Sequence, residues 1–258
     1  PPRSTLFPYT TLFRSDKLLP YGLYDALLDE GLRQALARYP ELKTVWGKLD
    51  PEEQPSRYAV FVAKVVEQAL RQEMDATARL ELCNQIVNVI AQSDGRTHFG
   101  EHRLAPAAKP LLLEITPPHY AQSGLLRPAT SIVDSSLFTG SPSEPQLIHE
   151  LQAEMASADE IDILISFIKW SGLRLLVPAF EDLLTRGVPV RMITTSYMGA
   201  SDSPAVEWIA RLPNASVKVS YDTERTRLHA KAYHFRRHSG FSTAYIGSAN
   251  MSDRKSVV

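Results

Sequence analysis

The stretch that decides the fold is HAKAYHFRRHSGFSTAYIGSAN, residues 229–250. It contains two runs typical of β-strands, at 228–235 and 243–250, with the short polar link RRHSGFS between them. A short link that contains glycine usually joins antiparallel neighbours. The stretch therefore predicts an antiparallel hairpin with its turn near His238–Gly240.

Four polar side chains gather on this predicted hairpin. Antiparallel pairing around the turn sets residue 229 near residue 249 and residue 231 near residue 247. His229 and Lys231 are two apart on one strand, and Ser248 and Asn250 are two apart on the other, so each pair shares a face. This register predicts a single polar cluster, whereas a slip of one residue would send one pair to the opposite face.

The residues before the hairpin alternate between helical and strand patterns. IDILISFI (161–168) is a continuous apolar run, which is typical of a strand buried on both faces. Strands joined by crossover helices indicate an α/β layered domain with a mostly parallel mixed sheet. The other expected elements are helices at 144–158, 172–187 and 203–212 and strands at 188–198 and 215–221.

The side chains of the predicted cluster suit chemistry at a phosphodiester. A neutral His229 imidazole is a capable nucleophile, and Lys231 supplies a fixed positive charge for the phosphoryl oxygens. The Ser248 hydroxyl and the Asn250 amide can donate hydrogen bonds to these oxygens, and Gly247 lets a phosphate approach the backbone. Because no acidic cluster lies nearby in the sequence to hold a divalent ion, we expect metal-independent chemistry and no cofactor.

HAK followed by GSAN resembles the H-x-K…G-S-x-N signature of the phospholipase D superfamily, and the resemblance covers roughly residues 130–252. It implies that His229 is the nucleophile, forming a covalent phosphohistidine, or the acid. It also implies that Lys231, Ser248 and Asn250 are phosphate ligands. In that family a second copy of the motif supplies the second histidine. A single half-site here therefore implies a homodimer or another copy of the motif elsewhere.

The chain departs from the family pattern at one position. The full motif places an aspartate five residues after the lysine, where this chain has Arg236. Nuclease-like members of the family often lack that aspartate. Because of this departure, a domain that binds nucleic acid without cutting it remains an alternative.

A finer resemblance involves residues 137–176. This stretch, and the helical stretch before it, is similar to the N-terminal region of long bacterial DEAD/DEAH-type helicase proteins that carry a phospholipase D-like domain ahead of the motor. The resemblance implies a nucleic-acid partner, with DNA favoured over RNA, and a helicase motor downstream. No G-x-x-x-x-G-K-[ST] motif occurs in the chain, so we expect no ATP site within it.

Further candidate substrate-binding residues flank the cluster. Lys169 and Trp170 follow the buried strand, at the edge of an open sheet where ligands usually bind. Trp170 could stack on a base, and ordinary packing is the alternative. Thr195 ends the next strand, where strand-end polarity is the alternative. Arg236 belongs to a predicted basic rim together with Arg225, Arg227, Arg237 and His238. A solvated charged loop would explain these residues nearly as well.

The N-terminal half is predicted to be helical and then rich in loops. Helical periodicity marks residues 23–39, 57–74 and 75–92, with Asp75 as the N-cap of the last. We expect an α-helical module at 16–95, a linker at 96–130 and the phospholipase D-like domain at 131–253. The ends, 1–15 and 254–258, resemble translated sequencing-adaptor read-through and are expected to be non-native.

Composition excludes several classes of protein. The formal net charge is −1, so no global basic signature marks a nucleic-acid binder. A single cysteine, Cys83, excludes an intrachain disulfide framework and a cysteine-rich zinc site, and it fits a cytoplasmic location. No apolar run of about 18 residues occurs, so we expect no membrane partner.

Three functions remain open from the sequence. The favoured one is a metal-independent nuclease half-site that works through a phosphohistidine within a helicase protein. The second is a catalytically degenerate module that binds nucleic acid for the motor. The third, a phospholipid hydrolase, is disfavoured by the absence of a membrane segment and by the resemblance to helicase proteins.

Overall fold

The computed structural model describes residues 19, 21–72, 74–93, 95–106, 111–115, 125–141, 144–222 and 228–252. Residues Pro1–Leu113 form one compact unit and Glu114–Val258 a second. The predicted non-native ends and the predicted rim residues Arg225 and Arg227 lie outside the described residues. The predicted division of the chain into five parts stays a prediction.

The first unit is helical in much of its described part. Its elements are α1 (Glu30–Ala37), α2 (Gln54–Leu70), α3 (Ala76–Ala91) and a 3₁₀ helix, η1 (Thr97–His102). The Asp75 carboxylate accepts a hydrogen bond from the Ala78 N–H at 2.7 Å and caps α3, as predicted. The helix predicted at 23–39 begins only at Glu30, because Asp29 caps it there by accepting from the Leu32 N–H.

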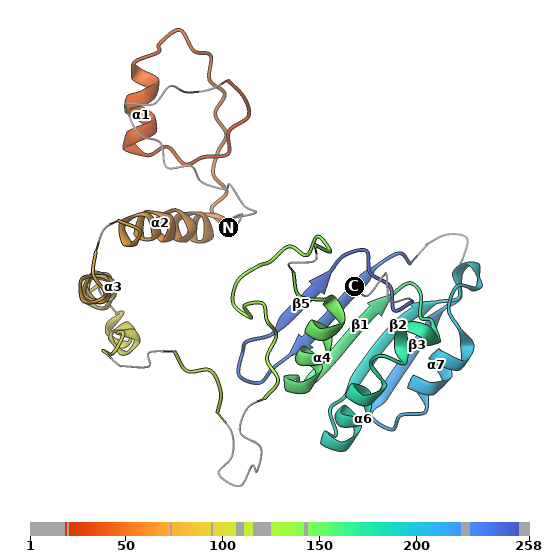
Figure 1. Ribbon diagram of the computed structural model, residues 1–258. Coiled ribbons are helices and arrows are strands. Elements are labelled where there is room, and N and C mark those ends of the chain that lie inside the picture. Colours follow the sequence, from red (N-terminus) through yellow and green to blue (C-terminus); the bar gives the residue numbers. More distant parts are fainter. Residues whose placement is uncertain are drawn as a thin grey trace. The chain divides into compact units, whose positions relative to one another are not determined.

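The second unit is built on a five-stranded mixed sheet in the order β3-β2-β1-β4-β5 (Figure 1). β1 is parallel to β2 and β2 to β3, whereas β4 is antiparallel to both β1 and β5. The predicted α/β fold with a mostly parallel mixed sheet is therefore confirmed. The strands are β1 (Glu160–Ile165), β2 (Val190–Thr195), β3 (Ala215–Ser220), β4 (Lys231–Arg236) and β5 (Thr243–Ile246).

Four α-helices of this unit are described: α4 (Leu147–Ser157), α5 (Trp170–Leu173), α6 (Val177–Arg186) and α7 (Ser203–Ala210). A short 3₁₀ helix, η2 (Tyr197–Gly199), follows β2. The stretch predicted as helix at 172–187 is divided: α5 ends at Leu173, and α6 begins at Val177 with Pro178 in its first turn, where proline is tolerated. Gly187, at a φ of 69°, closes α6 in the left-handed conformation that glycine favours.

Only one face of the sheet is buried. Ile161, Ile163 and Ile165 alternate with half-exposed residues along β1, so the prediction of a strand buried on both faces is wrong. Helices α4 and α6 lie over this face (Figure 1), and their apolar residues share one core with β1, β2 and β4. The opposite face carries ion-paired residues, among them Asp162 and Arg191. Odd-numbered residues of β4 therefore face the core.

The hairpin has the predicted register. Ala232 pairs with Ile246 and Tyr233 with Tyr245, and the Gly247 N–H donates to the Lys231 carbonyl at 3.1 Å. The same register, extended by one residue, gives the expected pairing of residue 231 with residue 247. The hairpin is nevertheless shorter than predicted, since β4 begins at Lys231 and β5 ends at Ile246.

The chain beyond β5 turns toward a different neighbour. Ile168 and Met251 form a parallel bridge, and the Lys169 N–H donates to the Met251 carbonyl at 2.7 Å. Because these groups draw the chain away from β4, Ser248 and Asn250 do not lie on a strand, contrary to the prediction. Asn250 instead lies beside the segment that follows β1.

Candidate active site

His229 and Lys231 are in direct contact at the start of β4. Lys231 Nζ lies 3.0 Å from His229 Nε2 and donates to the His229 carbonyl at 3.2 Å. The lysine is only 5% exposed, whereas His229 is exposed. Burial lowers the pKa of the Lys231 ammonium. An Nε2 that accepts from an ammonium carries its lone pair, which is the nucleophilic form of imidazole.

The predicted partners from the other side of the hairpin divide between two places. Gly247 and Ser248 line the same cavity as Lys231. Asn250 does not line that cavity, and its Oδ1 accepts a hydrogen bond from the Phe167 N–H at 3.3 Å. The β1–β4 register pairs Ile165 with Lys231, so its continuation sets residue 167 opposite residue 229. His229 and Asn250 thus flank the same backbone, although no direct contact joins them.

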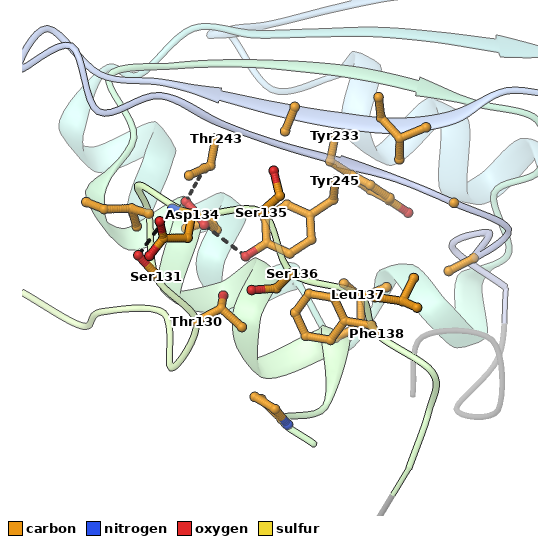
Figure 2. Close-up of a pocket in the computed structure, with 18 of the residues that line it drawn as sticks. Thr130, Ser131, Asp134, Ser135, Ser136, Leu137, Phe138, Tyr233, Thr243 and Tyr245 are labelled. Atoms are coloured by element: carbon orange, nitrogen blue, oxygen red, sulfur yellow. Dashed lines mark hydrogen bonds between the residues drawn. The ribbon is translucent and has the colours of Figure 1, made fainter. Parts of the chain in front are cut away.

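The cavity beside Lys231 has a volume of about 800 Å³. Its floor is formed by β4 and β5, and one wall is the segment 130–140, which runs past Tyr233 and Tyr245 (Figure 2). This volume falls in the range of pockets that hold small ligands. No pattern in the sequence indicates that 130–140 forms a wall of the site.

Two carboxylates hold the wall at its ends. The buried Glu150 carboxylate accepts from the Ala129 N–H, the Thr130 N–H and the Thr130 hydroxyl at 2.6–3.1 Å. Glu144 accepts from the Thr139 N–H at 2.7 Å and from the Gly140 N–H at 3.1 Å. The Thr139 N–H, chiefly, keeps the pKa of Glu144 below its usual value. The wall is thereby fastened to α4 and to the residues just before it.

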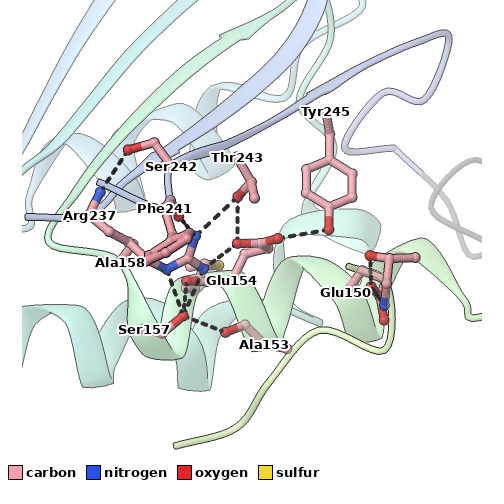
Figure 3. Close-up of polar contacts among 12 residues, drawn as sticks. Glu150, Ala153, Glu154, Ser157, Ala158, Arg237, Phe241, Ser242, Thr243 and Tyr245 are labelled. Atoms are coloured by element: carbon pink, nitrogen blue, oxygen red, sulfur yellow. Dashed lines mark hydrogen bonds and ion pairs between the residues drawn. The ribbon is translucent and has the colours of Figure 1, made fainter. Parts of the chain in front are cut away.

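A buried ion pair lies behind the cavity (Figure 3). Glu154 of α4 is 0% exposed and pairs with Arg237, whose side chain is 8% exposed. The Thr243 hydroxyl donates to Glu154 at 2.7 Å and the Tyr245 hydroxyl at 2.9 Å. Arg237, predicted to belong to a basic rim, therefore turns inward, since Glu154 and the Ser157 hydroxyl offer it acceptors.

Comparison with known families matches residues 148–257 to the family described as "Cardiolipin synthase, PLD-like domain". The match covers the sheet, its helices and the hairpin with the histidine and lysine. This part of the chain is therefore similar to phospholipase D-like domains. No curated protein matches the chain. The match supports a superfamily of the phosphodiesterase type.

His229 lies beside the cavity without lining it, and the remaining predicted residues of this domain lie apart from it. Lys169 Nζ pairs with Asp202 at 3.0 Å, and Trp170 packs edge-on against Trp208 at 6.2 Å between ring centroids. The Trp170 N–H, chiefly, lowers the pKa of Asp202 by donating to its carboxylate. These contacts favour the packing alternative for Trp170, which is still 41% exposed.

Thr195 and Arg236 also lie away from the His–Lys pair. The Thr195 hydroxyl donates to the Ser220 carbonyl at 3.1 Å, which is the strand-end polarity considered as the alternative. Arg236 is at the far end of β4, where its Nη1 lies 2.6 Å from Glu160 Oε2. Its even position on the strand turns it to the uncovered face of the sheet. His238 is 82% exposed at the hairpin turn.

Two absences apply to the described residues alone. Among them, no group of three or more His, Cys, Asp or Glu side chains is placed to hold a metal ion. None of their helices has the length and apolar character needed to cross a bilayer. Metal-independent chemistry, a cytoplasmic location and the absence of a membrane partner stay predictions.

Proposed function

We propose that the domain is one half-site of a metal-independent phosphodiesterase that cleaves nucleic acid through a phosphohistidine. The observation that carries the proposal is the 3.0 Å approach of Lys231 Nζ to His229 Nε2 beside the cavity. A phosphoryl group that binds beside the pair would accept from the Lys231 ammonium and so release the Nε2 lone pair for attack.

The proposed reaction has two balanced steps. In the first, His229 Nε2 attacks phosphorus, the bond to the leaving oxygen breaks, and the histidine of a second half-site protonates that oxygen. In the second, water attacks phosphorus, the P–N bond breaks, and the second histidine takes the proton of the water. Lys231 and the Ser248 hydroxyl stabilise the charge on the phosphoryl oxygens. A homodimer or another copy of the motif would supply the second half-site.

Nucleic acid is the proposed substrate, with DNA favoured over RNA. The resemblance of residues 137–176 to helicase proteins with a phospholipase D-like domain supports this choice. On the same ground we propose that a helicase motor follows in the full-length protein and that the domain works in the cytoplasm.

Two alternatives have their own supporting observations. Arg236 replaces the aspartate of the full family motif, which favours a degenerate module that binds nucleic acid without cutting it. The matched family is described by the name of cardiolipin synthase, which favours phospholipid as the substrate.

A nuclease assay in EDTA tests the proposal with three proteins: wild type, His229→Ala and His234→Ala. His234 is the matched control, because it lies on the same strand but faces Asp162 on the uncovered side. Wild type and His234→Ala should cut single- or double-stranded DNA, and His229→Ala should not. Cutting that persists without His229 would refute the mechanism. Binding without cutting by wild type would favour the degenerate module.

A further inference from the structure

The Tyr233 hydroxyl has no hydrogen-bond partner among the residues that the structure describes. Tyr233 is only 4% exposed, and burial raises the pKa of its phenol, which therefore stays protonated. The side chain lines the cavity, yet no described residue donates to or accepts from its hydroxyl. The hydroxyl is not among the fully buried atoms that lack a partner, so it is accessible from the cavity and can hydrogen-bond to a ligand there.

Tyr245 provides an internal comparison. It pairs directly with Tyr233 across the hairpin and lines the same cavity. Its hydroxyl, however, donates to Glu154 Oε1 at 2.9 Å. The two rings point away from each other in Figure 2. One tyrosine thus completes a buried network, and the other leaves a donor and acceptor facing the hollow.

The charge of the cavity limits what it can hold. Lys231 is the single cation among the described residues that line it. The Glu154 carboxylate is neutralised by Arg237. A second carboxylate, Asp134, lies on the wall and is exposed. The rest of the lining consists largely of hydroxyl groups and apolar side chains, including Thr130, Ser131, Ser135, Ser136, Phe138 and Thr139. This arrangement suits one phosphoryl group at Lys231 attached to a neutral group that bears hydroxyls.

We infer that the cavity holds the hydroxyl-bearing carbon skeleton esterified to the phosphoryl group, and that Tyr233 recognises it by hydrogen bonding. This inference rests on the proposed phosphodiesterase function. The skeleton is a sugar in a nucleotide and glycerol in a phospholipid. Tyr233 is a specificity-determining residue of the site, because its hydroxyl acts on the attached group and leaves the reacting phosphorus to His229 and Lys231.

The test compares three p-nitrophenyl phosphodiesters, whose second ester group is methyl, thymidine or glycerol. The proteins are wild type, Tyr233→Phe and Tyr245→Phe, each as the full chain. Tyr233→Phe should lower kcat/KM for a hydroxyl-bearing ester by roughly 3- to 10-fold, the usual effect of one hydrogen bond. Its kcat/KM for the methyl ester should equal that of wild type. A loss with the thymidine ester identifies a nucleotide sugar, and a loss with the glycerol ester identifies a lipid headgroup.

Stability separates the two tyrosines. Tyr233→Phe should unfold at the same denaturant concentration as wild type, whereas Tyr245→Phe should be less stable and should lower all three rates alike. Equal loss on all three esters in Tyr233→Phe would overturn the inference, and so would no loss on any.

Binding distinguishes this inference from the proposed reaction. If wild type cleaves none of the esters, the proposed function fails. Thymidine monophosphate, glycerol phosphate and methyl phosphate are then titrated into wild type and Tyr233→Phe. Weaker binding of either hydroxyl-bearing phosphate alone would keep the inference. Unchanged binding of all three would overturn it.

Discussion

The buried Glu154–Arg237 pair allows a stability prediction of known size. Glu154→Gln keeps the shape of the side chain and one acceptor for Tyr245 or Thr243, but it removes the charge that compensates Arg237. Breaking one side of a buried pair costs about 3–5 kcal/mol, because the remaining charge is left uncompensated. Arg237 keeps the Ser157 hydroxyl and the Phe241 carbonyl as acceptors, so we expect a value near 3 kcal/mol.

The chain offers a matched control for this substitution. Glu160 and Arg236 form an ion pair at 2.6 Å whose side chains are 37% and 46% exposed. Solvent screens such a pair, so Glu160→Gln should cost at most about 1 kcal/mol.

The assay is urea denaturation followed by tryptophan fluorescence. In a Trp46→Phe background the signal comes from Trp170 and Trp208, which both lie in the second unit. Equal midpoints and slopes for the Glu154→Gln and Glu160→Gln proteins would refute the reasoning, since burial would then make no difference.

Three further predictions concern single residues. Lys231→Met should abolish cleavage yet raise the free energy of unfolding at pH 7, because burial disfavours the charged lysine in the folded state. This gain in the free energy of unfolding over wild type should shrink as pH rises toward the pKa of the lysine. In Gly172→Ala a Cβ would lie 2.5 Å from the Met251 carbonyl carbon, so the loop holding Asn250 should shift and cleavage should fall, which activity and hydrogen exchange would detect. Hydrogen bonding to Arg191 lowers the pKa of Asp162, so the small stability difference between wild type and Asp162→Asn should vanish as pH falls through that pKa in denaturation curves.

Local pattern was enough to predict the hairpin and its register. Turn residues and alternation fix which residues of adjacent strands face each other, so the pairing of residue 231 with residue 247 could be predicted. The position of Asn250 could not be predicted, because it depends on a bridge between Ile168 and Met251, which are far apart in the sequence. Long-range pairing leaves no periodic signal in either segment.

The inward turn of Arg237 was equally hidden. Two adjacent arginines, Arg236 and Arg237, look alike in the sequence and were both assigned to a basic rim. One lies on a strand position that faces solvent, and the other meets a buried carboxylate from a helix about 80 residues earlier. The role of the segment 130–140 as a wall of the cavity was hidden as well, since its anchors Glu144 and Glu150 act only after folding.

The same buried carboxylate explains why two tyrosines that face each other differ in chemistry. Glu154 accepts from Tyr245 and also from Arg237, which fixes the position of the carboxylate. Its two oxygens already accept from Arg237, Thr243 and Tyr245, and Tyr233 is left as the hydroxyl that faces the cavity. The ion pair behind the wall thus determines which polar groups are available to a ligand. A variant that loses the pair, such as Glu154→Gln, should therefore alter ligand specificity as well as stability.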